Sequence, residues 1–394
     1  MAQSISQEAI GATGLPGATA ASRHAGATTS GAPTTGTFAV GDYVVDQTGA
    51  MYVCTVAGTP GTWTQPAVPL TENVAGKNFI INGGMDIWQR GTTSSSAGYQ
   101  TADRWWFNAS ASTTQSQSTS TVPPGSQYSF KMLIGGSAAS VNLRQVVETK
   151  NTLPLAGQTV TFSGLVQASA SVGMTLTLYY STVVDDNVSS GAWVGVAGTG
   201  GSTTGTAVSG SWTRIAGTFL IPSTAQSLLI YIANTSGTVA SATSIYLGQL
   251  QLEIAPQATP FSRAGGSIGG ELALCQRYFE MSFAQGVTPA NGSSTTSIAT
   301  AQGMWGGSGS NVSPNYPSGF IPFKVEKRTA SYTVTSYGNS LGYWGYGIGP
   351  GTPTFNASVV AFYNYSTNGI GISNQAINAT MVSMFGHWTV SAEL

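Results

Sequence analysis

The stretch Asn78–Phe107, NFIINGGMDIWQRGTTSSSAGYQTADRWWF, decides how the rest of this sequence is interpreted. An apolar run leads into a Gly83-Gly84 turn, and a second apolar run ends at Arg90-Gly91. Apolar segments with β-branched and aromatic bias that are bounded by Gly and Ser are typical of strands. We therefore predict strands here, with a Ser/Thr/Gly loop before Trp105-Trp106.

Two arginines and three tryptophans stand in this stretch, although charged residues make up only 7% of the chain. A guanidinium pairs with carboxylates or stacks on aromatic rings. We expect Arg90 and Arg104 to pair with Asp86 or Asp103, or to stack on the indoles. Two interpretations stay open: a strand and loop that fasten a β-sandwich, or an exposed aromatic platform for glycan.

The order N-x-I-I-N-G-G-M-D-I-W-Q-R-G, followed by A-D-R-W, resembles a segment of many tailed-phage virion proteins, chiefly tail fibres. Leu247–Glu253, followed by Ala258–Phe261, is similar to the closing strand and exit of the same domain. In those proteins the two segments bracket a jelly roll similar to carbohydrate-binding modules. The resemblance implies such a jelly-roll domain in residues 73–262 of an all-β chain.

Composition limits the classes of protein that this chain can represent. A chain of 394 residues has room for several domains. The net charge is −1 and no basic patch occurs, which argues against nucleic-acid binding. No run of about 18 apolar residues occurs, so we expect no membrane insertion. Aromatic residues at 10% argue against disorder.

The N-terminus lacks the basic and apolar regions of a signal peptide, so we expect folding in a host cytoplasm. Cys54 and Cys275, the two cysteines, fall in different expected domains. We predict that both are reduced, buried and not joined by a disulfide. A virion-surface location after lysis of the host agrees with these features.

The remaining segments are separated by their composition and periodicity. Residues 1–30 are small and polar and are predicted to be an attachment arm. Residues 31–72 alternate with period two around a Gln47–Gly49 turn and are predicted to be a small β module that associates with copies of itself. Residues 263–281 contain the predicted connecting helix, and residues 282–394 are predicted to be a second antiparallel β-sandwich.

Period-two alternation in residues 73–262 predicts about eight to ten strands, which fits a two-sheet jelly roll. The strands predicted there are Ser129–Ile134, Ala139–Val147, Thr159–Ala168, Met174–Tyr180, Trp212–Leu220, Ser227–Asn234 and Ser244–Ile254. Residues 181–210, rich in Gly, Ser and Thr, are predicted to be a loop. The strands predicted in the second sandwich are Ser297–Met304, Gly319–Val325, Ala330–Ser336, Ala357–Tyr365 and Gly386–Glu393.

The predicted helix has Leu272, Cys275 and Phe279 on one face, by their i, i+3, i+7 spacing. Its sequence, E-L-x-x-C-Q-R-Y-F-E, resembles the connector before the tip domain of many tail-fibre proteins. We predict that this face packs along the threefold axis of a homotrimer.

Aromatic residues interleaved with Gly in expected loops are candidates for glycan contact, because ring faces stack on sugar C–H surfaces. These candidates are Trp193, Trp305, Tyr343, Trp344 and Tyr346. An alternative stays open, in which Tyr343 and Trp344 close the rim of the second sandwich.

No cofactor is expected, apart from a structural Ca²⁺. The resemblance to carbohydrate-binding jelly rolls implies that Asp86, Asp103 and Glu253 would hold this ion. An alternative Ca²⁺ site is the loop that contains Asp185 and Asp186.

We expect no catalytic site. Glycoside hydrolysis uses two carboxyl groups about 5 to 10 Å apart, whereas the adjacent Asp185 and Asp186 would point to opposite sides of an extended strand. His24 is expected to be solvated and His387 to be structural, and they belong to different segments.

These features predict a non-enzymatic phage fibre or receptor-binding protein. It would be a homotrimer that attaches to other virion proteins through residues 1–30 and binds host surface glycan through its β domains. Weak sugar binding repeated over the copies would give avidity without a deep pocket. Two alternatives stay open: a capsid-decorating or head-fibre protein, and a tailspike that depolymerises glycan.

Overall fold

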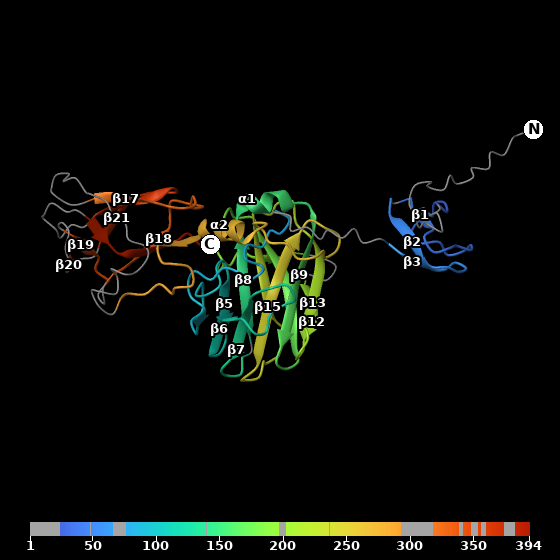
Figure 1. The fold of residues 1–394 in the computed structure, drawn as a ribbon, viewed down its shortest axis with the longest axis horizontal. Coiled ribbons are helices and arrows are strands. Elements are labelled where there is room, and N and C mark those ends of the chain that lie inside the picture. Colours follow the sequence, from blue (N-terminus) through green and yellow to red (C-terminus); the bar gives the residue numbers. More distant parts are fainter. Residues whose placement is uncertain are drawn as a thin grey trace, which may run out of the picture. The chain divides into compact units, whose positions relative to one another are not determined.

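The computed structural model describes residues 24–47, 49–65, 76–138, 140–196, 202–235, 237–292, 318–338, 342–347, 354–355, 360–373 and 383–394. The chain forms two compact units, Met1–Thr71 and Glu72–Leu394, and each is described by itself (Figure 1). The predicted strand Ser297–Met304 and most of the predicted arm lie outside the described residues.

The first unit is a three-stranded antiparallel sheet in the order β1-β2-β3. Its strands are β1 (Tyr43–Val45), β2 (Met51–Val56) and β3 (Thr62–Thr64). β1 and β2 form the predicted hairpin. The Asp46 carboxylate accepts hydrogen bonds from the amides of Gly31 and Ala50, both at 2.9 Å, which fixes the loop beside the turn. Cys54, like Cys275 in the second unit, is free and buried, as predicted.

The second unit begins with a sandwich of two six-stranded antiparallel sheets. One has the order β11-β10-β14-β8-β5, with β12 also paired to β10, and the other has the order β13-β9-β15-β7-β6-β4. From β7 to β10 and from β12 to β15, successive strands alternate between the two sheets. This is the predicted jelly roll.

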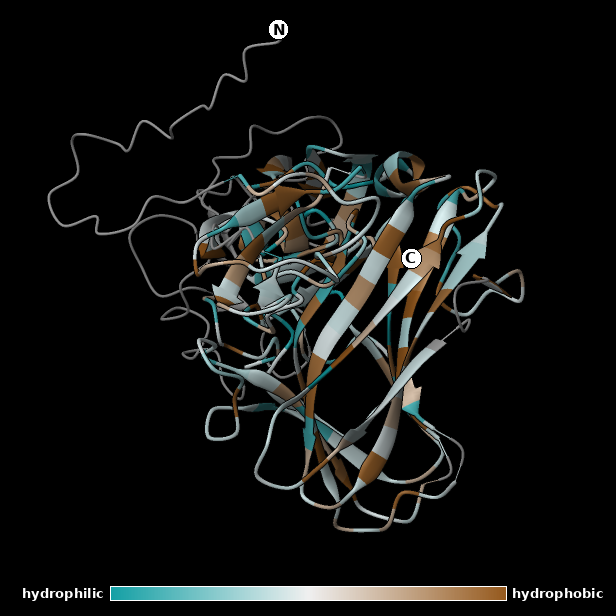
Figure 2. Cartoon of the chain, turned by 90° about the vertical axis from the view of Figure 1, so that its right-hand side faces the viewer, coloured by the Kyte–Doolittle hydropathy of each residue, from teal (hydrophilic) through white to brown (hydrophobic). Residues whose placement is uncertain are grey.

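The bounds of the jelly-roll elements are β4 (Thr93–Ser94), β5 (Trp106–Ala109), β6 (Thr113–Ser118), β7 (Ser129–Ile134), β8 (Val141–Val147), α1 (Thr149–Thr152), η1 (Leu153–Leu155), β9 (Thr159–Ala168), β10 (Val172–Ser181), β11 (Val194–Gly195), β12 (Ser202–Ala207), β13 (Thr213–Leu220), β14 (Ser227–Asn234) and β15 (Ser244–Glu253). β7, β9 and β14 begin and end at the predicted residues. Apolar and polar bands alternate along the long strands (Figure 2), which is the pattern that made them predictable.

The core of the jelly roll lies between the two sheets and contains apolar side chains from both. It includes Phe107, Leu143, Leu176, Leu178, Ile230 and Ile232 from one sheet, and Phe130, Phe162, Val166, Leu247 and Leu252 from the other. Each such side chain contributes about 1.5–3 kcal/mol when it is fully buried.

Residues 181–210 are not the loop that was predicted, because they contain β11 and β12, which both pair with β10. β12 has the sequence STTGTA, so its side chains are small and mostly polar. A strand of small, mostly polar residues has no apolar alternation, and therefore gives no period-two signal.

The stretch that opens the jelly roll also differs from the prediction, since residues 79–92 contain no strand. Asn82 has a left-handed φ of 57°, a conformation that asparagine tolerates better than most residues. Its side chain accepts hydrogen bonds from the amides of Asp86 and Ile87 at 2.9 Å and donates to the carbonyl oxygens of Ile87 and Asp103. One buried side chain thus pairs backbone groups that a sheet would otherwise pair.

The C-terminal part of the second unit is also all-β, as predicted. Its described strands form three three-stranded antiparallel sheets, in the orders β16-β24-β18, β17-β22-β21 and β20-β19-β23. These strands are β16 (Phe279–Met281), β17 (Ser318–Pro322), β18 (Thr333–Tyr337), β19 (Gly345–Gly347), β20 (Thr354–Phe355), β21 (Ala361–Ser366), β22 (Gly369–Ser373), β23 (Ser383–Phe385) and β24 (His387–Ser391). β17, β18, β21 and β24 overlap predicted strands.

The predicted helix is α2 (Ile268–Gln276). Ser267 caps it, because its hydroxyl accepts a hydrogen bond from the Gly270 amide at 3.1 Å. Cys275 is buried in a cluster with residues of the jelly roll, and Leu272 packs against the same cluster. Phe279 is 5% exposed. The prediction that this face lies along a threefold axis is therefore wrong, since its own chain covers it.

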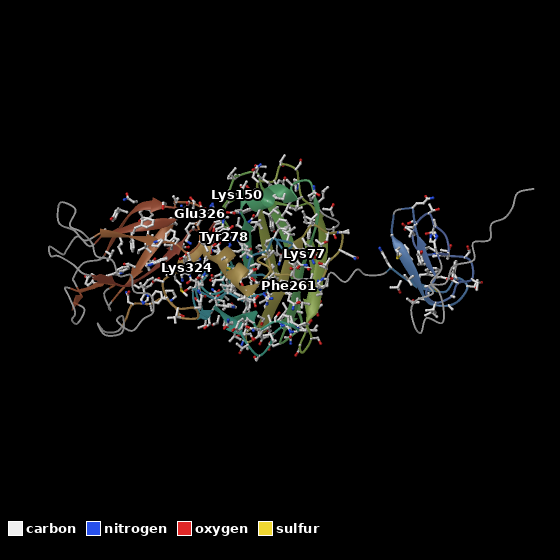
Figure 3. All side chains as sticks on the ribbon, turned by 45° about the horizontal axis from the view of Figure 1, so that its top comes forward. Lys77, Lys150, Phe261, Tyr278, Lys324 and Glu326 are labelled. Atoms are coloured by element: carbon white, nitrogen blue, oxygen red, sulfur yellow. The ribbon has the colours of Figure 1, made fainter. Side chains whose placement is uncertain are left out.

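The last residues of the chain close against the opening stretch. The Glu393 carboxylate accepts hydrogen bonds from Arg90 Nη2 at 2.8 Å and from Arg104 Nη1. The Arg104 guanidinium stacks on the ring of Tyr278, 3.5 Å from its centroid. Tyr278, which Figure 3 labels, belongs to the segment that follows α2. The Arg90 guanidinium stacks on Phe279 at 3.7 Å. We call these five residues the Glu393 cluster.

The expected partners of the two arginines were wrong. Asp86 instead accepts a hydrogen bond from Arg263 Nε at 2.8 Å, and Asp103 accepts one from the Gln89 amide at 3.0 Å and another from its side chain. The rings that the guanidiniums contact are Tyr278 and Phe279, from beyond α2, and Tyr99 of the opening stretch, and not the nearby indoles.

We expect Glu393→Gln to lower the free energy of unfolding by about 3 kcal/mol, because it leaves buried guanidinium charge uncompensated. The side chains of Arg104 and Glu393 are only 1% and 7% exposed. Urea unfolding followed by tryptophan fluorescence measures this loss. The control is Glu326→Gln, at an exposed carboxylate, which should change stability by less than about 0.5 kcal/mol. Equal losses in the two variants would contradict this role of Glu393.

The buried carboxyl of Asp103 makes the free energy of unfolding depend on pH. Burial raises the pKa of its carboxyl to about 6, although the Arg90 charge and the hydrogen bonds from Gln89 lower it. A carboxyl whose pKa is higher in the folded than in the unfolded chain binds its proton more readily when folded. The stability from this group is therefore full below the unfolded pKa, and it is lost as the pH rises through about 6.

We expect the free energy of unfolding of the unaltered chain to fall, relative to that of Asp103→Asn, as the pH rises from about 4 to about 6. Urea titrations of both proteins across this range measure the difference. Two curves that stay parallel would contradict the shifted pKa.

Candidate functional site

The sheet β11-β10-β14-β8-β5 has one face toward the core and one face outward. Along β10, fully buried leucines alternate with half-buried threonine and tyrosine residues. Strand register places Trp106 of β5 beside Arg144 of β8, Arg144 beside Tyr231 of β14, and Tyr231 beside Thr177 of β10. We call these four residues, together with Tyr179, the Arg144 face.

The guanidinium of Arg144 lies between two aromatic rings. Its central carbon is 4.8 Å from the ring centroid of Trp106 and 5.1 Å from that of Tyr231. Arg144 Nε donates a hydrogen bond to Asn142 Oδ1 at 2.9 Å. The Tyr179 ring meets Tyr231 edge to face, with 5.7 Å between centroids. Rings and guanidinium thus hold one another in place before any ligand arrives.

Several polar groups of the Arg144 face remain without a protein partner. In the part of the chain that the structure describes, none is found for the indole N–H of Trp106, the hydroxyl of Tyr231 or the terminal nitrogens of Arg144. Burial raises the pKa of the Tyr179 hydroxyl, with a further increase from Tyr231, so this hydroxyl stays protonated and able to donate at neutral pH.

The arrangement suits a chain of sugar rings. Aromatic faces pack against sugar C–H groups, and N–H and O–H donors bind sugar hydroxyls. The next row of the same sheet face adds the amide of Asn108 and the hydroxyl of Thr175, both half-buried, on either side of the buried Asn142 and Ala233. Apart from the guanidinium, the outward side chains of both rows are uncharged.

Of the predicted glycan contacts, Trp193 is the one that the structure brings near the Arg144 face. It lies just before β11, whose Gly195 pairs with Tyr179, and both aromatic residues pack against the same apolar cluster. Trp193 is half-buried, and its Nε1 donates to the Asn187 carbonyl oxygen at 3.0 Å.

Trp344 is a correction, because its ring is 0% exposed. It packs in an apolar cluster with Ile370 and Trp388, as the alternative of a closed sandwich rim expected. The packing is so close that a Cβ on Gly386 would stand 2.2 Å from the Trp344 ring. A buried ring cannot stack on a sugar.

For the other three predicted glycan contacts, the described residues show no shared surface. Tyr343 is half-buried. Tyr346 lies in β19, where the structure describes the backbone. Trp305 lies outside the described residues.

The three carboxylates expected to hold Ca²⁺ are not brought together. Asp86 and Asp103 bind Arg263 and Gln89, as described above, and Glu253 accepts hydrogen bonds from the Thr259 amide at 2.9 Å and hydroxyl at 2.6 Å. Nowhere in the described residues do three His, Cys, Asp or Glu side chains gather where they could hold a metal ion. The predicted grouping is therefore wrong.

The remaining acidic and histidine candidates make protein contacts. Asp185 pairs with Arg328 at 3.2 Å, and Asp186 is buried. His387 is 4% exposed and stacks on Phe283, with 4.0 Å between ring centroids. Burial lowers the pKa of His387, which keeps the ring neutral. These contacts fit structural roles.

Two hollows lie elsewhere among the described residues. One, of about 210 Å³, is lined by Ala170, Ser171, Val172, Gly173, Asn234, Thr235, Gly237, Thr238, Val239, Ala240 and Thr243. The other, of about 280 Å³, is lined by Asp86, Ile87, Trp88, Thr92, Gln117, Tyr128, Gln285 and Gly286. Neither set of lining residues contains a pair of carboxylates. Separately, none of the described helices has the length and apolar character that crossing a membrane requires.

Neither a protein-family model nor a curated protein matches this chain. Among solved structures, it is similar to the carbohydrate-binding module TmCBM61 in complex with β-1,4-galactotriose, with 12% identity over 45% of this chain and 99% of that one, at a TM-score of 0.31. It is also similar to the CBM22-1 xylan-binding domain of Paenibacillus barcinonensis Xyn10C, with 15% identity over 47% and 98%, at a TM-score of 0.28.

A third similar structure is the enzymatically active domain of tailspike protein 4 of bacteriophage CBA120. The identity is 13%, the match covers 45% of this chain and 22% of that one, and the TM-score is 0.31.

We expect Trp344→Ala to lower the free energy of unfolding by about 3–5 kcal/mol, because it opens a cavity in the C-terminal core. Trp344→Phe is the control. It keeps most of the apolar ring and removes an indole N–H that has no hydrogen-bond partner in the described residues, so its loss should be less than half as large. Urea unfolding measures both. A negligible loss for Trp344→Ala would mean that the ring is not core.

Proposed function

We propose that this chain is a non-enzymatic protein that binds glycan of a host cell surface through the Arg144 face. The observation that carries the proposal is the outward row of Trp106, Arg144 and Tyr231, whose ring faces and free donors stand side by side on neighbouring strands. Rigid, preordered side chains lose little freedom when a ligand binds, which favours recognition on an open surface.

We propose that the chain does not hydrolyse the glycan that it binds. Glycan hydrolysis needs two carboxyl groups that face each other across the substrate. The strands of the sheet that bears the Arg144 face contain no Asp or Glu. Glu393 and Asp185 form ion pairs within the chain, with Arg90 and Arg328.

We also propose that the chain is a fibre of a tailed-phage virion, assembled in the host cytoplasm and displayed on the particle surface. The support is the resemblance carried by N-x-I-I-N-G-G-M-D-I-W-Q-R-G and A-D-R-W. Residues 1–30 would attach the fibre to other virion proteins. A homotrimer would repeat the Arg144 face and raise the avidity of weak sugar binding.

We expect Trp106→Ala and Tyr231→Ala each to weaken glycan binding about tenfold, because each removes a stacking surface with a hydrogen-bond donor. Binding of the full chain to an array of bacterial surface glycans measures this. The matched control is Tyr246→Ala on the other sheet, where the Lys131 ammonium lies 5.9 Å from the tyrosine ring centroid.

The control variant should bind glycan like the unaltered chain. Equal binding by all three variants would remove the Arg144 face from the function, and release of reducing sugar from a bound glycan would contradict the absence of turnover. A map of the particle would test the location, and light scattering would test the trimer.

A further inference from the structure

Arg144 is the one charged side chain in the strands of its sheet. The six strands read WFNA, VNLRQVV, VGMTLTLYYS, VG, STTGTA and SLLIYIAN, and together they contain no Asp, Glu or Lys. A neutral glycan would be served by uncharged donors such as the Trp106 indole N–H and the Tyr231 hydroxyl. Binding of a neutral glycan therefore does not explain why a positive charge, that of Arg144, stands on this sheet face.

Most other arginines of the described residues have a carboxylate partner within the chain. These arginines are Arg90, Arg104, Arg263, Arg277 and Arg328. Arg144 differs from them, because among the described residues it has no ion pair and its one hydrogen bond, from Nε, goes to an amide oxygen. The N–H groups of its two terminal nitrogens have no hydrogen-bond partner among the described residues.

The surroundings of Arg144 prepare it to bind an anion. The rings of Trp106 and Tyr231 hold the guanidinium from two sides and exclude part of its water, and attraction between charges is stronger where water is excluded. A guanidinium presents two parallel N–H groups that match the two oxygens of a carboxylate. Nε is already bound to Asn142, so the terminal nitrogens remain for the ligand.

The dimensions of the row fit a chain of sugars. Neighbouring strands lie about 4.8 Å apart, so the four strands that carry Trp106, Arg144, Tyr231 and Thr177 span about 14 Å. That is enough for more than one sugar ring. The charge lies inside the row, between two stacking rings, and not at its end.

We infer that the Arg144 face takes an acidic glycan, in which the carboxylate of a uronic acid binds Arg144 while adjoining sugar surface packs on Trp106 and Tyr231. This inference rests on the proposed function, since it names the class of glycan for the same face. Because Arg144 is the single charged residue in the strands of this sheet, the face would bind one carboxylate of the glycan at a time.

The test compares each glycan with its own neutralised form. The full chain is titrated calorimetrically with oligomers of polygalacturonate, alginate and hyaluronan, and with the same oligomers after methyl esterification of their carboxyl groups. We expect at least one uronic-acid oligomer to bind about tenfold or more tightly than its ester, because hydrogen bonds between charged groups are the strong ones.

Variants assign the preference to Arg144. Arg144→Gln should abolish the difference between acid and ester and keep the weaker binding that the rings provide. Arg144→Lys should keep part of the difference, since an ammonium retains the charge and loses the two-pronged geometry. Lys131→Gln, which removes a cation beside a tyrosine on the other sheet, is the matched control and should change nothing. Circular dichroism verifies that each variant folds.

The outcomes separate this inference from the proposed function. Equal binding of acid and ester, lost in Trp106→Ala, would overturn the inference and leave glycan binding intact. Absence of binding to every acidic and neutral glycan would overturn both. Binding of dextran sulfate as tightly as any uronate, unaffected by Trp106→Ala, would show unspecific attraction and overturn the inference. So would a change of molar mass in Arg144→Gln, because the face would then lie between copies of the chain.

Discussion

The carboxylate of Glu393, held between the guanidiniums of Arg90 and Arg104, is the contact on which the second unit depends. It joins residues that are 303 and 289 positions apart in a chain with few charges. Tyr278 and Phe279 cover the two guanidiniums, and α2 lies directly before them. The opening stretch, the connector and the last strand therefore form one core, although composition separates them into different segments.

The period-two pattern of apolar residues predicted the long strands well. The predictions were wrong where the structure depends on hydrogen bonds from side chains or on contacts between residues far apart in the sequence. β7 and β10 alternate buried with less buried side chains along most of their length, so period two located them. Residues 79–92 are apolar for a different reason: they are buried in irregular backbone that Asn82 holds together. β12 has no apolar alternation at all. The partners of Arg90 and Arg104 were missed because proximity in sequence favoured Asp86 and Asp103 over a glutamate near the last residue.

The candidate site was missed for a related reason. Trp106, Arg144 and Tyr231 are isolated residues in three separate strands, and only the strand order and register bring them together. The period-two pattern of VNLRQVV does place Asn142 and Arg144 on the polar face of their strand. The sequence could therefore predict that Arg144 lies on the outer face, but not which residues of other strands lie beside it. Contiguous aromatic residues such as Tyr343-Trp344 give a stronger signal in the sequence than separated ones do, but Trp344 is buried.

The Glu393 cluster also bears on how this architecture can be inherited. A recombination event that replaced everything after β15 with the distal part of another protein would bring two guanidiniums against a surface that had not evolved with them. Distal segments can therefore be exchanged only among relatives that supply a matching acid and two matching rings, or together with the segment that opens the jelly roll. The first unit, compact by itself, contains none of the five residues of the Glu393 cluster.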